Sequence, residues 1–192
     1  MFPSCVWVEK LNFNTDKLIS NLDEFKKQGL KVKHSNINGD QYEDYRNKDL
    51  TDAILRSFPK VHGKPKINFT LFHMWVNMNP KGASNSRHTH TTFNRELLLS
   101  GVYYVKVPEN SGRIRFYDPR MIASINPPDY EYYHESAQYN FIVPQEDMVI
   151  FFPSWFEHDV EENKSNDERI SIGFNIFSEV EDIKMGNAYN VE

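Results

Sequence analysis

The sequence predicts a mainly β protein in which a helical N-terminal region packs on a jelly-roll-like body. Beyond Pro65, short runs rich in Ile, Val, Phe and Tyr follow one another, separated by Gly, Pro, Asn and Asp. This pattern is typical of successive strands in a sandwich or barrel. Since no linker or repeat divides the 192 residues, we expect a single domain, helical over about 1–64 and β over about 65–180.

Two amphipathic segments in the first third predict helices over about 15–28 and about 51–58. Asn14 or Thr15 can cap the first helix and Gly29 ends it, whereas Thr51 caps the second and Pro59 ends that one. Apolar residues recur at helical spacing in both: Leu18, Leu22 and Phe25 in the first, and Ala53, Ile54 and Phe58 in the second. The polar segment between the two helices is expected to be a loop.

Six later runs predict strands, because each is short, rich in β-branched and aromatic residues, and bounded by turn residues. They cover 66–78, 97–108, 112–119, 139–144, 147–153 and 168–177. The long segment 121–138 contains a Pro-Pro pair and several aromatic residues. Since long loops in compact domains are usually functional or disordered, we interpret it as a lid or rim over the mouth of the β body.

Bulk properties exclude several classes of protein. The net charge of −5, with acidic and basic residues intermixed, gives no bulk attraction to a polyanion, so nucleic-acid binding is not indicated. Cys5 is the only cysteine, so neither an intrachain disulfide nor a cysteine-based zinc site can form, which favours the cytoplasm. No run approaches the roughly 20 apolar residues that span a bilayer, so no membrane association is expected.

Three histidines are candidate metal ligands. In an extended segment residues two apart point the same way, so His88 and His90 can face one centre. His158 follows the apolar run 147–153, where a strand can deliver a side chain to the mouth of a barrel. Three neutral nitrogen donors leave open positions on an iron ion. Taken singly, each histidine is equally compatible with a solvated loop or a strand end.

The run 168–177 alternates strictly between polar and apolar residues. Its apolar side suits packing against the N-terminal helices, so its polar side, with Arg169, Ser171 and Asn175, would line the interior. A buried arginine is costly unless an anion pairs with it, so Arg169 and Ser171 form a candidate carboxylate clamp. The alternative is an arginine on an edge strand that faces solvent.

Five blocks of sequence occur in a specific order: "HTH", "LSGVYYV", "GRIRFYDPR", "FPSWFEHDV" and "ERISIGFN". In this order they resemble a family of iron(II)- and 2-oxoglutarate-dependent oxygenases of bacteria and phages, similar to the prolyl 4-hydroxylases. The resemblance covers about 36–177 and implies a double-stranded β-helix (jelly-roll) core. The resemblance also implies that His88, His90 and His158 bind iron(II). It implies that Arg169, Ser171 and Tyr104 bind 2-oxoglutarate.

The sequence departs from the family pattern in two places. The wider superfamily has a carboxylate where this chain has His90, so either three histidines bind the metal or Asp118 or Glu96 replaces one of them. We favour His90. The link from His90 to "LSG" is also longer than usual and makes Arg95 available to a substrate. Trp75 on the run 66–78 and Asn175 on the run 168–177 are further candidates to contact the substrate.

The predicted function is therefore an oxygenase that hydroxylates an unidentified small molecule or peptide and releases succinate and CO2. One alternative is a cupin-like three-histidine metalloenzyme that does not use 2-oxoglutarate, in which Arg169 holds the substrate. Another is a non-enzymatic jelly-roll interaction protein. The apolar face of the N-terminal helices is compatible with a homodimer. If the chain is of phage origin, the compartment is the host cytoplasm.

Overall fold

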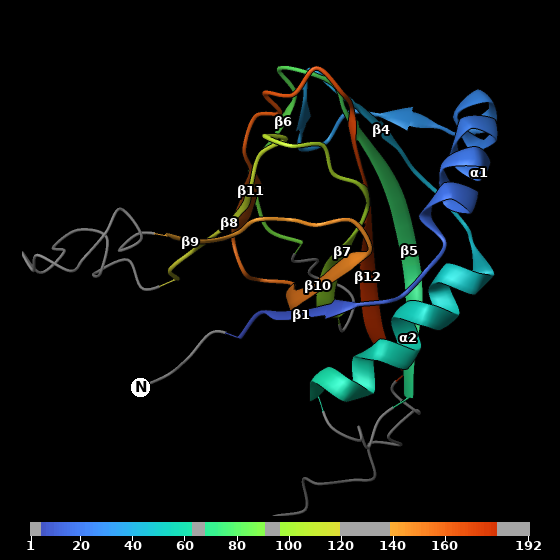
Figure 1. The fold of residues 1–192 in the computed structure, drawn as a ribbon. Coiled ribbons are helices and arrows are strands. Elements are labelled where there is room, and N and C mark those ends of the chain that lie inside the picture. The colour runs from blue at the N-terminus through green and yellow to red at the C-terminus, as the bar shows by residue number, and fades with distance from the viewer. Residues whose placement is uncertain (1–4, 63–67, 91–96, 120–138, 180–192) are drawn as a thin grey trace, which may run out of the picture.

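The computed structural model describes residues 5–62, 68–90, 97–119 and 139–179, and it forms two antiparallel sheets that face each other (Figure 1). The seven-stranded sheet contains, in spatial order, β1 (Trp7–Lys10), β10 (Met148–Pro153), β7 (Leu97–Lys106), β12 (Arg169–Glu179), β5 (Asn68–Asn79), β4 (Asp40–Tyr42) and β2 (Lys31–Val32). The five-stranded sheet contains β3 (Asn36–Ile37), β6 (Ser84–His88), β11 (His158–Val160), β8 (Ile114–Tyr117) and β9 (Tyr139–Ile142). This architecture confirms the predicted jelly-roll core.

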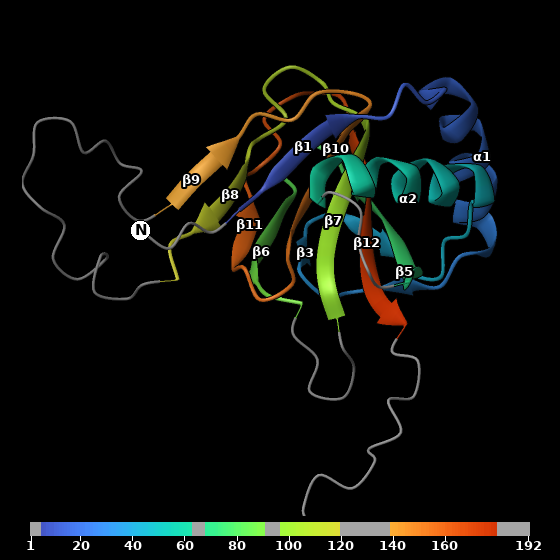
Figure 2. The same cartoon turned by 90° about the horizontal axis from the view of Figure 1, so that it is seen from below.

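Both helices lie on the outer face of the seven-stranded sheet, away from the five-stranded sheet (Figures 1 and 2). The helix α1 (Thr15–Gln28) has the predicted bounds, and Asn14 caps it by accepting a hydrogen bond from the Lys17 backbone N–H at 3.0 Å. The helix α2 (Lys48–His62) begins earlier than predicted and continues through Pro59. Its cap is Asn47, whose side chain accepts from the Leu50 N–H at 3.0 Å, so Thr51 lies inside the helix. No helix in the described ranges is both long and apolar enough to cross a bilayer.

The alternation of β12 separates two apolar cores. Its apolar side chains pack under the two helices with residues from α1, α2 and β5: Ile170, Ile172, Phe174 and Ile176 with Leu18, Leu22, Leu50, Ile54 and Val76. Its polar side faces the space between the sheets. A second core closes that space from both sheets: Tyr104, Ile150 and Phe152 meet Ile114, Phe116 and Phe156. The predicted alternation is thus confirmed, and one face of β12 is free to line a site.

The N-terminal third contributes four strands as well as two helices, which the sequence does not predict. The strand β1 pairs with β10 at one edge of the large sheet, β4 and β2 extend the other edge from β5, and β3 pairs with β6 in the small sheet. The segment expected as a polar loop therefore contains β3 and β4. The strands β2, β3 and β4, of two or three residues, are too short to show alternation, so only their partners identify them.

The two segments that contain the candidate histidines are also strands. His88 is the last residue of β6 and His158 the first residue of β11, and the two residues lie directly opposite each other in antiparallel register. His158 therefore does not end the apolar strand β10. A turn after Pro153 takes the chain across to the other sheet, where His158 begins a new strand.

Candidate metal and cosubstrate site

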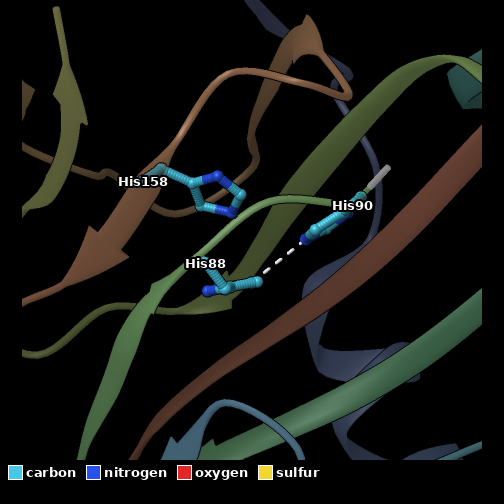
Figure 3. Close-up of side chains that lie close together, drawn as sticks. All are labelled: His88, His90 and His158. Carbon is cyan, nitrogen blue, oxygen red and sulfur yellow. Dashed lines mark hydrogen bonds between the residues drawn. The ribbon is translucent and has the colours of Figure 1, made fainter. Parts of the chain in front are cut away.

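His88, His90 and His158 converge on one point between the sheets. One ring nitrogen of each lies within 4.8 Å of those of the other two, and Figure 3 shows the three rings directed toward one another. The strand pairing of β6 with β11 places His88 against His158, and the two-residue spacing brings His90 to the same side. Within the described ranges, no other three His, Cys, Asp or Glu side chains come together in this way.

The hydrogen bonds around the rings select one tautomer for all three histidines. Each Nδ1 faces an oxygen that can only accept, so each Nδ1 carries the proton and each Nε2 keeps a free lone pair. The three contacts are His88 with the Ser86 carbonyl at 2.7 Å, His90 with Asn175 Oδ1 at 3.1 Å, and His158 with the Phe156 carbonyl at 2.9 Å. Such support of the outer ring nitrogen is what metal-binding histidines show.

The distance between two of the lone pairs also fits a metal. The Nε2 atoms of His88 and His90 are 3.1 Å apart, although neither carries a proton in the tautomers above. For metal–nitrogen bonds of about 2.1 Å, adjacent ligands of an octahedral ion lie about 3 Å apart. The pair is therefore spaced as two adjacent ligands would be, and a cation between the nitrogens removes the repulsion of their lone pairs.

Burial keeps the three imidazoles neutral. Loss of solvent lowers the pKa of His90 to about 4 and that of His158 well below its usual value, with a further contribution from the neighbouring histidines. The pKa of His88 is lowered too, again chiefly by burial. Since a metal ion binds the neutral form of histidine, the site is ready to bind one at neutral pH without first losing protons.

Asn175, which the sequence suggests as a substrate contact, lies directly behind His90. Its Oδ1 accepts from His90 Nδ1 and also from the Ser100 hydroxyl at 2.8 Å. The strands β12 and β7 place Asn175 and Ser100 opposite each other, so both are available to one ring. Asn175 also lines the larger cavity described below. The support that Ser100 gives depends on strand register, which no local motif reveals.

Arg169 is a buried cation whose guanidinium is only partly satisfied. The residue is 1% exposed, and its Nη1 donates to the Ser111 carbonyl and, at 3.4 Å, to the Glu161 carbonyl. Its Nη2 is buried with no hydrogen-bond partner, as is the hydroxyl of Tyr104. Burial lowers the pKa of Arg169 and raises that of Tyr104 to about 12. Two unpaired buried donors of this kind suit a carboxylate.

Arg169, Ser171 and Tyr104 line one narrow cavity together with all three histidines. The guanidinium and the three imidazoles line the same cavity, where the charge of a small dicarboxylate suits both the guanidinium and a metal ion. The fold thus brings the three histidines together with Arg169, Ser171 and Tyr104, two groups that lie apart in the sequence. It does so because β12 and β7 present their polar residues to the same space that β6 and β11 enter from the other sheet.

A larger cavity of about 550 Å³ is also lined by two of these histidines, His88 and His90, together with Trp75. The Trp75 indole crosses Gly173 on the paired strand, where a β-carbon would collide with the ring. A glycine inside the strand "SIGFN" is a sequence signal for such a close approach. The sequence also does not reveal four polar residues of the same cavity: His34, Gln41, Glu43 and His73.

Of the two carboxylates considered as replacements for His90, the structure describes Asp118, which does not join the histidines. Asp118 is outside the cluster. Asp159, although adjacent to His158, faces away and binds Arg115 at 2.6 and 2.8 Å and the Tyr117 hydroxyl at 2.7 Å. Arg95, Glu96 and the proposed lid 121–138 lie outside the described residues.

Comparisons with solved structures show the same fold. A prolyl-4-hydroxylase of Pseudomonas putida gives a TM-score of 0.60 at 12% identity, over 90% of this chain and 92% of that one. A viral collagen prolyl hydroxylase from Paramecium bursaria Chlorella virus-1, in complex with 2-oxoglutarate, gives 0.57 at 18% identity over 89% and 94%. A prolyl hydroxylase of Trichoplax adhaerens, in complex with a hypoxia inducible factor peptide, gives 0.64 at 14% identity over 91% and 84%. A comparison with curated protein sequences found no match.

A family model supplies the identification. The model described as "Putative 2OG-Fe(II) oxygenase" matches residues 73–175, more than half of the chain. This range contains β6 to β11 and more than half of both β5 and β12, and with them the three histidines, Arg169 and Ser171. The prediction from the five sequence blocks is confirmed. The chain belongs to the 2OG-Fe(II) oxygenase family and is an iron(II)- and 2-oxoglutarate-dependent oxygenase.

Proposed function

We propose that His88, His90 and His158 bind the iron(II) of this oxygenase through their Nε2 atoms. The convergence of three neutral imidazoles, each with its Nδ1 engaged by an acceptor, is the observation that carries this assignment. Three histidine ligands on one face leave the remaining positions of an octahedral ion for cosubstrate and dioxygen. When bound, iron(II) supplies the redox chemistry that the side chains lack.

Arg169, with Ser171 and Tyr104, binds the distal carboxylate of 2-oxoglutarate in this proposal. The Nη2 of Arg169 and the hydroxyl of Tyr104, which are buried without a hydrogen-bond partner, both donate to that carboxylate. The carboxylate in turn neutralises a guanidinium that burial destabilises. These residues orient the cosubstrate and exclude water from one side of the metal, and no proton transfer is assigned to them.

The reaction is a hydroxylation: a substrate C–H bond, O2 and 2-oxoglutarate give the C–OH product, succinate and CO2. One oxygen atom of O2 enters the product and the other enters succinate, so 2-oxoglutarate and the substrate C–H bond each supply two of the four electrons that reduce O2. The prime substrate is a small molecule or a peptide, because the cavity of about 550 Å³ beside His88 and His90 is of the size that accepts either a small ligand or one side chain. We place the reaction in the cytoplasm, where the exposed Cys5 and iron(II) both stay reduced.

Calorimetry of 2-oxoglutarate binding tests the cosubstrate assignment directly. Protein loaded with iron(II) without oxygen should bind 2-oxoglutarate, and Arg169→Ala should lower the affinity at least about tenfold, the cost of losing a charge-assisted hydrogen-bond pair. Arg56→Ala, an exposed arginine on α2, is the matched control and should bind like the wild type. Unchanged affinity in Arg169→Ala would overturn the assignment of this residue.

Product analysis separates this function from a three-histidine enzyme that does not use 2-oxoglutarate. In air, the iron-loaded protein should convert 2-oxoglutarate slowly to succinate even without a prime substrate. The double variant His88→Ala/His158→Ala should lose both the bound iron, near one equivalent in the wild type, and this turnover. Succinate formation that persists in the double variant at the wild-type rate would refute the metal assignment.

A further inference from the structure

A second polar group lines the larger cavity, centred on Glu43 immediately after β4. The Glu43 side chain is only 12% exposed, and its Oε2 lies 2.5 Å from His73 Nε2 on β5. Its Oε1 accepts from the Gln41 side-chain amide at 3.0 Å and lies 3.5 Å from His34 Nε2. None of these side chains belongs to either apolar core, and all four line the cavity that also contains His88 and His90.

A row of neighbouring rings, tilted against one another, leads from this polar group to the metal position. The His73 ring lies 5.3 Å from the Trp75 ring, which in turn lies 5.4 Å from the His90 ring, measured between centroids. A molecule that reaches from Glu43 to the histidines therefore passes Trp75. It follows that the carbon presented to the metal is separated along the substrate from the group that Glu43 binds.

The cavity contains one carboxylate and one buried acceptor that has no hydrogen-bond partner. Among the described residues that line it, Glu43 is the one carboxylate and there is no lysine or arginine. Gln41 is 4% exposed, and its Oε1 is buried with no hydrogen-bond partner although its amide nitrogen is engaged by Glu43. A buried acceptor without a partner costs free energy, and a donor brought by a ligand would recover it.

A second metal ion does not explain this group. Glu43, His34 and His73 do not form a cluster of three ligand atoms within 4.8 Å, a criterion that only the three-histidine site meets in the described ranges. A ligand rich in N–H donors fits this group, because it can donate to the unpartnered Gln41 oxygen and also to the Glu43 carboxylate, whose oxygens each accept more than one hydrogen bond. The indole face of Trp75 next to them attracts the same cations.

We propose that Glu43 and Gln41 form the anchor for the prime substrate and bind a basic nitrogen, either an ammonium or a guanidinium group. The proposal rests on the proposed function, since it treats the cavity beside the histidines as the place of the prime substrate. The substrate class is thus an amine or guanidine with an aliphatic chain that runs along Trp75 toward His90. The chain of a small amine and the side chain of a Lys or Arg residue in a peptide share this chemistry.

Matched ligand pairs test the anchor without knowledge of the natural substrate. Butylammonium is compared with butanol and butylguanidinium with butylurea, and butyrate serves as the anionic counterpart. Binding is measured by ligand-observed NMR on protein loaded with Zn(II), a redox-inert substitute for iron, and 2-oxoglutarate. Both cations should bind at least about tenfold tighter than their neutral partners, as charge-assisted hydrogen bonds require, and butyrate should bind least.

Substitutions locate the preference. Glu43→Gln should reduce the preference for cations to about twofold or less, and Gln41→Met should weaken cation binding about threefold with no effect on butanol. Glu9→Gln on β1, outside every cavity described here, is the matched control and should keep the wild-type preference. Thermal unfolding verifies that each variant is folded, and Gln41→Met provides an independent test if Glu43→Gln is unstable.

The outcomes separate this inference from the proposed function. Equal binding of cations and neutral partners to the wild type, or a cation preference unchanged in both Glu43→Gln and Gln41→Met, overturns the anchor. Calorimetry of 2-oxoglutarate on the same samples reports the proposed function, and Glu43→Gln should leave the 2-oxoglutarate affinity unchanged.

A pentapeptide with a central lysine, compared with one that has norleucine, then distinguishes the two sources of the basic nitrogen. Tighter binding than butylammonium favours a peptide, and weaker binding favours a small amine.

Discussion

His90 occupies a position where the wider superfamily has a carboxylate, and its surroundings suit an imidazole. Asn175 Oδ1 lies 3.1 Å from its Nδ1, and the Trp75 and Phe152 rings flank it with centroids at 5.4 and 6.0 Å. An aspartate here would have no N–H to offer Asn175. With three neutral ligands, a bound iron(II) would keep its full charge, which strengthens its attraction for the dianionic cosubstrate.

Substitution of His90 should show whether it is a ligand. His90→Ala should weaken iron(II) binding about a hundredfold or more, because one of three donors is lost, whereas His90→Asp should restore most of the affinity with an oxygen donor. Competition with a chromophoric chelator under anaerobic conditions measures both. His34→Ala changes a histidine of the same cavity outside the metal cluster and should bind iron normally. Wild-type affinity in His90→Ala would exclude it as a ligand.

Gly173 gives room to the Trp75 indole, so this glycine is a matter of packing. Gly173→Ala should destabilise the protein by roughly 1–3 kcal/mol, the usual cost of forcing extra atoms into a packed site, and should shift the tryptophan fluorescence. Urea unfolding measures the change. In a Trp75→Leu background the same substitution should cost markedly less, because the ring with which the β-carbon collides is gone. Equal costs in both backgrounds would disprove the steric explanation.

At the scale of secondary structure, the site depends on strand register. The antiparallel pairs His158 with His88 and Asn175 with Ser100 each place two site residues opposite one another. The first pair brings two of the proposed metal ligands together, and the second supports His90 from behind. A shift of one residue in either pair would turn its side chains to the other face of the sheet, so the apolar cores on both faces also specify the site.

The Ser100–Asn175 pair should tune the metal without contacting it. Asn175→Ala removes the acceptor that orients His90, and the loss of such a contact typically lowers metal affinity about 10- to 100-fold. Ser100→Ala removes only the supporting hydroxyl, so a smaller loss is expected. Chelator competition measures both, and thermal unfolding of the apo proteins separates a general loss of stability from an effect on His90. Identical affinities in wild type and Asn175→Ala would remove this role.

Two neighbouring strands of the small sheet are joined by an ion pair that should make stability depend on pH. Arg113 donates to Glu161 from its backbone N–H, Nε and Nη2, and this holds the pKa of Glu161 below its usual value of 4.5. Since the folded state binds this proton less readily than the unfolded state, the stabilisation is present above about pH 4.5 and is lost as the pH falls.

Denaturant unfolding between pH 6 and pH 3 checks this expectation. The wild type should lose free energy of unfolding as the pH falls below 4.5, and Glu161→Gln should lose less over the same interval because it has no carboxyl to protonate. Glu9→Gln, which removes a carboxylate from β1, should retain the wild-type slope. Parallel slopes for wild type and Glu161→Gln would show that this ion pair does not contribute.

At the scale of the whole molecule, the site joins the two sheets. His88 and His158 come from the five-stranded sheet, whereas Arg169, Ser171 and Tyr104 come from the seven-stranded sheet. In the proposed arrangement, iron and 2-oxoglutarate would together connect both layers, and only the folded protein would offer the complete set of contacts. Ligands that bind the folded state alone stabilise it in proportion to their occupancy.

Thermal unfolding should reflect this connection in two steps. Iron(II) should raise the melting temperature, 2-oxoglutarate should raise it further, and a ligand at one hundred times its Kd adds about 2.7 kcal/mol at 25 °C. A chelator should reverse both increments. Arg169→Ala should keep the first increment and lose the second. A 2-oxoglutarate increment of wild-type size in Arg169→Ala, or one that does not need the metal, would contradict the proposed arrangement.

Local sequence patterns are enough to predict α1, the longer strands and the polar face of β12, because these depend on residues that are neighbours along the chain. The family blocks identify the candidate ligands in the same way. The short strands β2, β3, β4, β6 and β11 are not predictable from local pattern, since each is stabilised by a partner strand distant in sequence. The pairing of His88 with His158, seventy positions along the chain, is of this kind. The burial of Arg169 and the contact between Glu43 and His73 are not predictable from local pattern either. Packing between residues distant in sequence alone decides which side chains are removed from solvent.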